Sequence, residues 1–343
     1  MKIAVLGATG HIGREVLQAL ADTGVPLTAV TALATASSQG AVTSYGEEDE
    51  ITVGDAARFD FSNVDLVISA IPADAAQQLL PNIAKQGVNV IDCSPAFRMD
   101  PDVPLCVAGV NDDAIKTARR NIVALPDALT CMLVQTLKPL DELAGLQRVV
   151  VSTYQSASGE GRAGMDELFS QTRAVFVNDP IVKEQFPKQI AFNAIPQVGD
   201  FREDGQTEAE FMLAVETKKV LQSKIKVSVS CVRIASFLGS GMSVAVECER
   251  DTDLTAVRAA LRRQSGLSVV DHRVEEGYVT PAEAAGEDSV YVSRLRHDNT
   301  VDSGLQFWVV ADSTRAGVAL NAARLALAWL GEKAEIRRTG TIH

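Results

Sequence analysis

The stretch that decides the fold is Gly7-Ala8-Thr9-Gly10-His11-Ile12-Gly13. It follows an apolar run, residues 2–6, and precedes an amphipathic segment, residues 14–21. This order predicts a strand, a glycine turn and a helix, which is the order that the dinucleotide-binding fingerprint requires. Glycines allow the tight turn and let the backbone approach a pyrophosphate at the helix N-terminus. The alternative is a βαβ turn without a ligand. The predicted cofactor-binding residues are Gly7, Thr9, Gly10, His11, Ile12 and Gly13.

Apolar runs alternate with helical patterns from here to residue 124. We expect strands at residues 27–33, 66–71, 88–91 and 121–124, and helices at residues 73–86 and 112–120. This alternation is typical of a doubly wound parallel sheet, a Rossmann-like α/β fold. The second strand ends in Ala34-Thr35-Ala36-Ser37-Ser38-Gln39-Gly40, which holds neither the acid that favours NAD nor the base that favours NADP. The fingerprint is therefore half complete, and we expect weakened NAD(P) binding.

A turn at Leu125-Pro126-Asp127-Ala128-Leu129-Thr130-Cys131 separates the two halves of the chain. It leads into an apolar helix that we expect at residues 132–140. The N-terminus of a helix offers backbone N–H groups and a positive dipole end, which lower the pKa of a thiol and stabilise an oxyanion. Whether a nucleophile stands at this turn decides whether the protein is an enzyme.

The second half shows a different sequence pattern, in which polar and apolar residues alternate along a strand and the expected helices are longer. Strands are expected at residues 148–155, 226–236, 243–249, 291–296 and 305–311, and helices at residues 163–177 and 207–221. This pattern favours an α+β domain with a mainly antiparallel sheet that is covered on one face. Glu160 is interpreted as part of a solvated first helical turn. The predicted domains are residues 1–127 and 128–313, with a helix at 314–330 that returns to the first domain and a frayed tail at 331–343.

Composition excludes several classes of protein. The chain has 343 residues and a net charge of −12, which opposes binding to nucleic acid or to an anionic membrane. No signal peptide or membrane-spanning run is recognised. Five cysteines, odd in number and without a CxxC pair, fit a reducing, cytoplasmic location. Four histidines, none near a cysteine or acid at ligand spacing, predict no metal site.

Motifs along nearly the whole chain resemble those of the aspartate-semialdehyde dehydrogenases. Besides the glycine turn, the resemblance is carried by Ser94-Pro95-Ala96-Phe97-Arg98-Met99-Asp100, Leu137-Lys138-Pro139-Leu140, Ser152-Thr153-Tyr154-Gln155-Ser156-Ala157-Ser158-Gly159, Ile190-Ala191-Phe192-Asn193-Ala194-Ile195-Pro196, Glu216-Thr217-Lys218-Lys219 and Trp308-Val309-Val310-Ala311-Asp312. The resemblance implies an NADP-binding Rossmann-like domain and an α+β domain for catalysis and dimerisation. It also implies a role in amino-acid biosynthesis, the reductive dephosphorylation of aspartyl phosphate to the semialdehyde.

The family's chemistry requires a cysteine thiolate in an Asn-Pro-Asn-Cys turn, an orienting glutamine, an acid/base histidine in Gly-His-Ser, and basic residues that hold the substrate. The resemblance assigns the orienting role to Gln155 and the phosphate-binding role to Arg98. It assigns the substrate carboxylate to Arg233 and a further substrate contact to Glu210.

The departures from the family pattern fall on the chemistry. The nucleophile position is Ala128, and the acid/base position in Gly239-Ser240-Gly241 is Ser240. The phosphate-binding lysine falls on Met212, the NADP-selecting arginine on Ser37, and the Gly-Gly turn near the nicotinamide on Ile71-Pro72. This pattern is similar to the Usg group, paralogues of the dehydrogenase that lack its thiol.

An alanine cannot form a thioester, and loss of a covalent nucleophile costs on the order of 10⁶ in rate. Cys131, three residues later, is a weak substitute, because a helical offset of about 4.5 Å exceeds what attack tolerates. The favoured hypothesis is a degenerate homologue, a pseudoenzyme that forms a homodimer and binds a small anionic ligand. The alternatives are an active NAD(P)-dependent oxidoreductase on an aldehyde or acyl-phosphate resembling a dicarboxylate, and a subunit of mixed dimers with an active paralogue.

Overall fold

The computed structural model describes residues 1–331, which divide into two compact units. The first unit comprises Met1–Val134, Lys219–Leu221 and the described residues from Thr314 onward. The second comprises Gln135–Lys218 and Gln222–Ser313, so the division falls within the helix α3 (Ala128–Ala144). The tail expected at residues 331–343 lies, after its first residue, outside the described residues.

The first unit is built on a six-stranded sheet with the order β5-β2-β1-β6-β7-β8. Its strands are β1 (Ile3–Leu6), β2 (Val30–Ala34), β5 (Gly54–Asp55), β6 (Leu66–Ser69), β7 (Asn89–Asp92) and β8 (Ile122–Ala124). Every neighbouring pair in this sheet is parallel. All residues of β1, β6 and β8 are buried, as expected for parallel strands that are covered on both faces. The predicted doubly wound sheet is confirmed.

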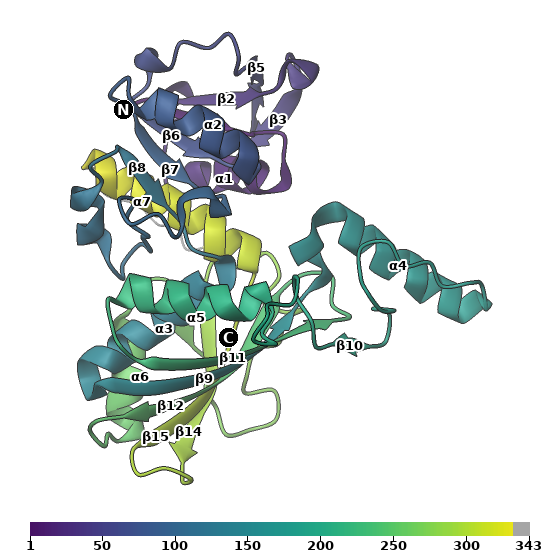
Figure 1. Ribbon diagram of the computed structural model, residues 1–343, viewed down its shortest axis with the longest axis vertical. Coiled ribbons are helices and arrows are strands. Elements are labelled where there is room, and N and C mark those ends of the chain that lie inside the picture. Colours follow the sequence, from purple (N-terminus) through teal and green to yellow (C-terminus); the bar gives the residue numbers. More distant parts are fainter. Residues whose placement is uncertain (332–343) are drawn as a thin grey trace. The chain divides into compact units, whose positions relative to one another are not determined.

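Helices cover both faces of this sheet (Figure 1). Ile3 and Val5 belong to one core cluster with side chains of α1 (His11–Asp22) and α7 (Leu320–Leu330). Alternate strand residues, such as Ala4 and Leu6, belong to a second cluster with side chains of α2 (Ala73–Ala84). Because neighbouring strand residues point to opposite faces, the continuous apolar run of β1 serves both cores.

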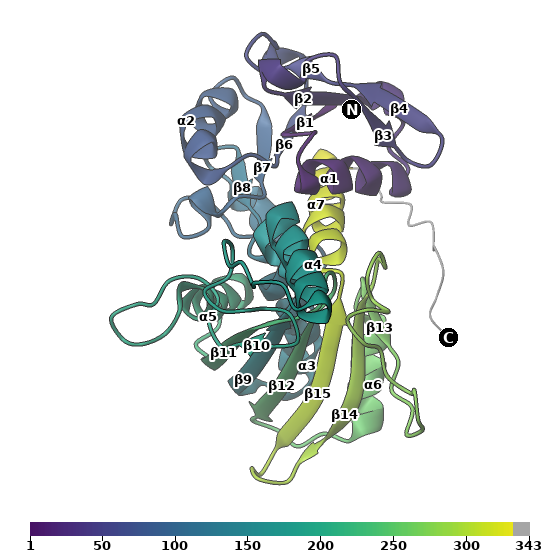
Figure 2. The same cartoon turned by 90° about the vertical axis from the view of Figure 1, so that its right-hand side faces the viewer.

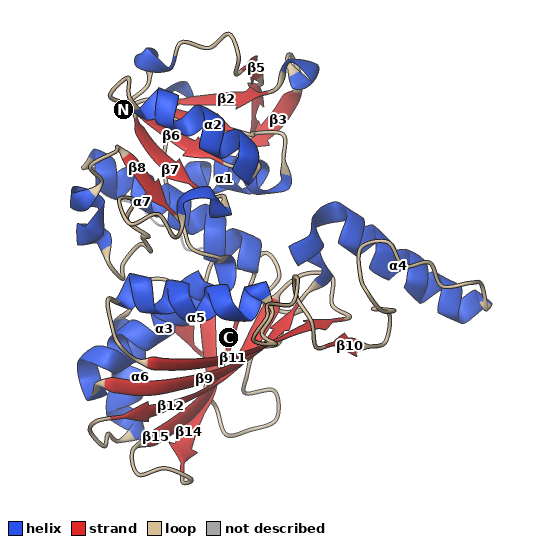
Figure 3. Cartoon of the chain, in the orientation of Figure 1, coloured by secondary structure: helices blue, strands red, loops and turns tan. Residues whose placement is uncertain are grey.

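The second unit contains a seven-stranded mixed sheet with the order β10-β11-β9-β12-β15-β14-β13 (Figure 3). Its strands are β9 (Leu146–Gln155), β10 (Ala194–Ile195), β11 (Lys226–Ile234), β12 (Ser240–Cys248), β13 (Leu267–Val269), β14 (Val290–Asp298) and β15 (Gly304–Ala311). Four of the six pairings are antiparallel, whereas β11/β9 and β13/β14 are parallel. The mainly antiparallel character expected from the sequence is confirmed.

The helices of the second unit take two kinds of position. The α3 helix and α6 (Leu254–Arg263) lie on one face of the sheet (Figure 2). By contrast, α4 (Gly161–Val177) projects away from the sheet (Figure 1) and exposes several large apolar side chains. The remaining helix, α5 (Glu208–Leu221), begins with a capping box in which Thr207 and Glu210 satisfy each other's backbone N–H groups.

Several boundaries differ from those expected, each for a local reason. Helix α3 begins at Ala128 rather than at residue 132, because the Asp127 carboxylate accepts the Leu129 N–H at 2.9 Å and caps the helix. The helix expected at residues 112–120 is a 3-10 segment, Asp112–Thr117. The helix expected at 314–330 begins as a π-helix, Ser313–Ala319, before α7.

Other elements were not predicted at all. The first unit contains a hairpin of β3 (Val42–Tyr45) and β4 (Asp49–Thr52). The strand expected from residue 27 is present, but it begins at Val30 after a 3-10 turn. The structure also contains three strands that were missed because each spans three residues or fewer, namely β5, β10 and β13. Helix α6 was missed as well. Within residues 1–331 no helix has both the length and the apolar character needed to cross a membrane.

Candidate functional site

The glycine turn joins β1 to α1 in a backbone arrangement that has no room for side chains. Gly7 has a φ of 89°, and its N–H donates to the Leu33 carbonyl at 2.9 Å. A Cβ on Gly13 would lie 2.1 Å from the Gly7 carbonyl oxygen. The turn and the first helical turn therefore pack backbone against backbone, which leaves a cradle that only glycines permit.

The N-terminus of α1 lies next to this cradle and has no side-chain cap. Gly10 is the N-cap residue, and no acidic residue lies in the first turn of the helix. Among the described residues, the buried Nε2 of His11 has no hydrogen-bond partner. Free N–H groups and the positive dipole end make such a terminus suitable for an anion such as a pyrophosphate.

The end of β2 carries hydroxyl groups where a ribose-reading residue is expected. Thr35 and Ser37 share a hydrogen bond of 2.9 Å at the surface. The neighbouring strand β5 pairs Asp55 with Ala34, and Arg58 follows at the same edge with its Nε 3.5 Å from an Asp55 oxygen. Sequence analysis missed this basic side chain, because a strand of two residues gives no periodic signal.

Arg98 holds the turn at residues 125–127. Its Nε donates to the Leu125 carbonyl at 3.0 Å, and its Nη1 lies 3.9 Å from an Asp127 oxygen. The side chain is only 12% exposed. Arg98 thus fixes the turn that precedes α3.

Ala128 is the first residue of α3 and is half-buried. Gly317 packs against it so closely that a Cβ on Gly317 would lie 3.0 Å from the Ala128 methyl carbon. The helix N-terminus that was expected to activate a nucleophile therefore presents a methyl group.

Cys131 lies one turn further along the same helix and is fully buried. Its sulfur accepts a hydrogen bond from Asn321 Nδ2 at 3.3 Å and lies 3.8 Å from the Pro126 carbonyl oxygen. The side chain belongs to the core cluster of α2. These contacts favour a structural role for Cys131 over a role as nucleophile.

Burial also disfavours the thiolate form at other cysteines. It raises the pKa of Cys106 to about 12 and that of Cys248 to about 11, and it raises the pKa of Cys93 further. Since the thiolate is the reactive form, burial disfavours a nucleophilic role for these three thiols at neutral pH.

Asp92, at the carboxyl end of β7, should make the stability of the protein depend on pH in the acidic range. Burial raises its pKa from 3.8 to about 6, although Ser94 donates to it through both its backbone N–H and its hydroxyl. The folded protein therefore keeps this proton over a range in which the unfolded chain has lost it. Stability should fall by about 3 kcal/mol as the pH rises from about 4 to 6.

Asp92→Asn should remove this loss, because an amide oxygen can still accept the Ser94 N–H without carrying charge. Urea unfolding at several pH values should show a smaller decline above pH 4 for the variant than for the unchanged protein. Equal declines in the two proteins would contradict the assignment.

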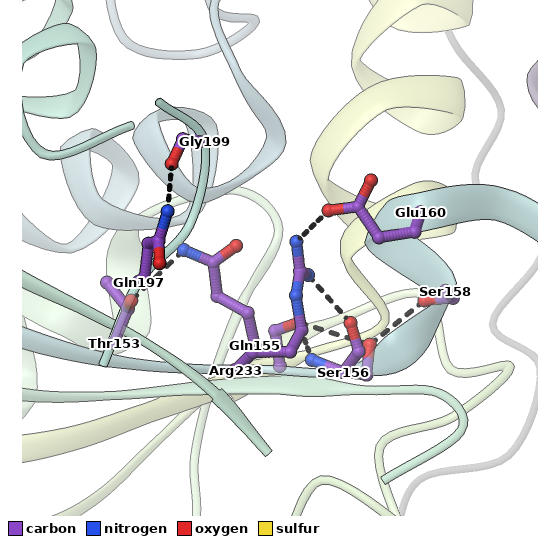
Figure 4. Close-up of polar contacts among 9 residues, drawn as sticks. Thr153, Gln155, Ser156, Ser158, Glu160, Gln197, Gly199 and Arg233 are labelled. Atoms are coloured by element: carbon purple, nitrogen blue, oxygen red, sulfur yellow. Dashed lines mark hydrogen bonds and ion pairs between the residues drawn. The ribbon is translucent and has the colours of Figure 1, made fainter. Parts of the chain in front are cut away.

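In the second unit, Gln155 is the last residue of β9, and it pairs with Arg233 near the end of the neighbouring parallel strand β11 (Figure 4). Gln155 Nε2 donates to the Thr153 hydroxyl at 3.1 Å. Arg233 is 4% exposed and donates to the Ser156 carbonyl at 2.8 Å and to Glu160 Oε1 at 2.6 Å. The expectation that Glu160 is merely solvated is therefore wrong, because its carboxylate pairs with a buried guanidinium.

Ser240 begins β12 within a chain of hydroxyl groups. Its Oγ accepts the Ser156 N–H at 3.4 Å and lies 3.4 Å from Ser156 Oγ, which in turn lies 2.9 Å from Ser158 Oγ. Hydroxyl groups do not titrate near neutral pH, whereas general acid–base catalysis needs a pKa in that range. This hydroxyl chain can orient groups but is poorly suited to moving a proton.

The backbone on either side of Ser240 is fixed by tight packing. Gly239 has a φ of 74°, and a Cβ there would lie 1.9 Å from the Pro281 carbonyl oxygen. A Cβ on Gly241 would lie 2.4 Å from the ring of Trp308, whose Nε1 donates to the Val279 carbonyl. Only glycines fit at both positions.

Glu210 is engaged by backbone groups on both carboxylate oxygens. Oε2 accepts the Thr207 N–H at 2.7 Å in the capping box, and Oε1 accepts the Cys231 N–H at 3.0 Å. Met212, at the position of the family's phosphate-binding lysine, is half-buried and carries no charge. In residues 1–331 no group of His, Cys, Asp and Glu side chains is arranged to hold a metal ion.

Comparisons with known proteins agree with this architecture. Residues 2–118 match the semialdehyde dehydrogenase NAD binding domain, and residues 137–316 match the semialdehyde dehydrogenase dimerisation domain. The chain is 37% identical to an aspartate-semialdehyde dehydrogenase of Rickettsia bellii, over 94% of this chain and 96% of the relative. A second relative, from Aquifex aeolicus, is 38% identical over 95% and 96% of the two chains.

A solved structure shares both units. The aspartate semialdehyde dehydrogenase II of Vibrio cholerae superposes with a TM-score of 0.91 at 35% identity, covering 96% of this chain and 98% of that chain. Identity of this extent over nearly the full length of each relative goes beyond a shared Rossmann-like fold. The chain belongs to the aspartate-semialdehyde dehydrogenase family.

Proposed function

We propose that this protein is a catalytically degenerate member of its family, similar to the Usg group, that acts as a dimeric binding or regulatory paralogue. The observation that carries the proposal is the methyl group of Ala128 at the first residue of α3. An alanine has no lone pair with which to form an acyl-enzyme. Ser240, at the acid/base position, lies in a hydroxyl chain and supplies no group that titrates near neutral pH.

The retained site residues support the same proposal. We propose that Gln155, Arg233 and Glu210 keep the family's substrate positions in the second unit, and that Arg98 keeps its position in the first. Each is bound to groups within its own unit: Gln155 to Thr153, and Arg98 to the turn before Ala128. Such contacts stabilise the fold whether or not a substrate binds, which explains why these residues persist without catalysis.

The proposed domains follow the predicted bounds. Residues 1–127 with the helix at 314–330 form the nucleotide-binding domain, and residues 128–313 form the domain for substrate and dimerisation. In the first, the cradle of Gly7, Gly10 and Gly13 and the open N-terminus of α1 fit a dinucleotide, with Thr9, His11 and Ile12 beside it. A bound nicotinamide dinucleotide would supply a hydride. Since no basic residue stands at position 37, we propose that NAD(P) binds weakly.

Turnover by the purified protein tests the degenerate function. With aspartate semialdehyde, phosphate and either NADP or NAD, we expect rates about 10⁶-fold below those of an active relative assayed in parallel. Ala128→Cys should not restore activity, because Ser240 at the acid/base position still supplies no group that titrates near neutral pH. The mass of the intact protein would confirm that the variant carries the substitution. A rate in the unchanged protein close to that of the relative would refute the proposal.

The open N-terminus of α1 also supports the alternative of an active oxidoreductase on a different substrate. Nicotinamide fluorescence, measured while NADH or NADPH is added, shows whether the protein binds the cofactor. No binding at millimolar cofactor would eliminate the oxidoreductase and leave the degenerate function standing.

We further propose a homodimer formed through the second unit. Its support is a set of exposed apolar side chains that we call the α4 apolar surface: Phe169, Val175, Phe176, Val177, Val182 and Phe192. Phe176 and Phe192 pack edge to face with ring centroids 5.7 Å apart. Exposed apolar surface of this kind marks a site of protein association. Co-expression with an active paralogue, followed by native mass measurement, would show whether mixed dimers also form.

A further inference from the structure

The pair of Arg233 and Glu160 is an unequal ion pair. The arginine side chain is 4% exposed and is wedged against the backbone, since a Cβ on Gly159 would lie 2.3 Å from its Nη1. The glutamate side chain is 40% exposed. Figure 4 shows Glu160 reaching Arg233 from the segment that precedes α4.

The two residues also differ in how firmly the chain holds them. Arg233 belongs to β11, which pairs along its length with β9. Glu160 lies between Gly159 and Gly161, the latter with a φ of 65°, and makes no side-chain cap to α4. The guanidinium is therefore fixed, whereas the carboxylate can turn toward solvent by rotation of its own side chain.

A buried guanidinium needs an anionic partner. Removal of one member of a buried ion pair leaves an uncompensated charge, which is far more costly than loss of a surface contact. If Glu160 turns away, another carboxylate can take its place, because the planar guanidinium matches the geometry of any carboxylate.

Space for such a ligand exists beside the pair. Arg233 and Glu160 both line a cavity of about 350 Å³ in the second unit, together with Gln197 and Glu184. A cavity of this size accommodates a small organic anion. A ligand there would lie beside the same guanidinium that Glu160 now contacts.

We propose that Glu160 is an internal competitor for a small carboxylate ligand of Arg233, so that the ligand binds only by displacing it. The inference rests on the proposed role of Arg233 as a carboxylate-binding residue. Glu160 thereby sets the specificity of the cavity, since it keeps weakly bound carboxylates out.

Calorimetric titration with succinate tests the competition. Glu160→Ala should bind succinate about 10- to 100-fold more tightly than the unchanged protein, the range expected for freeing one charge-assisted contact. Glu160→Gln should show a smaller gain, because its amide oxygen can still accept from Arg233 without a charge. Glu184→Gln is the matched control: it removes a carboxylate from the same cavity wall and should leave the affinity unchanged.

Further variants separate competition from a purely structural ion pair. In the double variant Glu160→Ala with Arg233→Met, tight succinate binding should disappear. Thermal unfolding with and without succinate shows that each variant is folded, and if Glu160→Ala is not, Glu160→Gln decides. Affinities no higher than that of the unchanged protein in the folded Glu160 variants would overturn the inference. An equal gain in Glu184→Gln would do so too, because it would show a general charge effect.

These outcomes are independent of catalysis, because the titration measures binding without cofactor or turnover. A high rate in the turnover assay would refute the degenerate function and leave the competition intact. If the titration shows no gain in succinate affinity, the proposed degenerate function is unaffected, because it rests on the missing nucleophile.

Discussion

Gly13→Ala is expected to lower the free energy of unfolding by about 3 kcal/mol or more and to abolish binding of any nucleotide. The added Cβ would lie 2.1 Å from the Gly7 carbonyl oxygen and 2.7 Å from its carbon, and both are backbone atoms. Gly7 has no room to move away, because the backbone of Ala70 lies close to it. A Cβ built on Gly7 would lie only 2.7 Å from the Ala70 carbonyl oxygen. Relief therefore requires α1 to move away from β1. Urea unfolding and NADH fluorescence measure the two effects.

Gly10→Ala provides the matched control within the same motif. Gly10 has a φ of −72°, which alanine adopts readily, and an added Cβ would lie 3.2 Å from the Gly7 carbonyl oxygen. We expect a loss below about 1 kcal/mol, as is usual at an N-cap position. A Gly13→Ala variant as stable as Gly10→Ala would show that the turn is not closely packed.

The glycine turn was predictable because its signal is contiguous. Strand, turn and helix follow one another within residues 2–22, and Gly7 and Gly13 are required by nearby atoms of that same short segment or of the residues that follow β6. The parallel sheet was predictable for a similar reason, since buried parallel strands appear as uninterrupted apolar runs.

The start of α3 was missed although its cause is also local. Asp127 caps the helix, yet the proline at 126 and the absence of apolar periodicity before Met132 favoured a longer turn. The correction places Ala128 on the helix itself. The hairpin of β3 and β4 was missed because each strand has only four residues and half or more of them are exposed, so that neither strand gives a clear alternating signal.

The ion-pair partner of Arg233 could not be predicted from the sequence. Glu160 and Arg233 are 73 residues apart, and no motif links them. A glutamate before a helix ordinarily favours the helix dipole, and this general preference suggested a solvated residue. The ion pair arises only because β9 and β11 are parallel neighbours, so that the segment after β9 meets the end of β11.

Replacement of both Phe169 and Phe176 with aspartate is expected to convert the proposed dimer into a monomer. The two side chains are 61% and 77% exposed and stand seven residues apart on α4, hence on one face of the helix. Within a protomer such exposed substitutions cost little stability. In an interface, aromatic side chains contribute about 2 kcal/mol or more each, so the dissociation constant should rise about 10³-fold.

Sedimentation velocity over a range of concentrations measures this change, and circular dichroism shows that α4 remains folded. Val274→Asp is the matched control, because it places the same charge on an apolar residue of the same unit that is 68% exposed but lies outside the α4 apolar surface. We expect this control to remain dimeric. A double variant that is still dimeric at low concentration would place the interface elsewhere in the second unit. The exposure of six apolar side chains on and around α4 would then need another cause, because a large exposed apolar patch usually marks a site that a partner or a ligand covers.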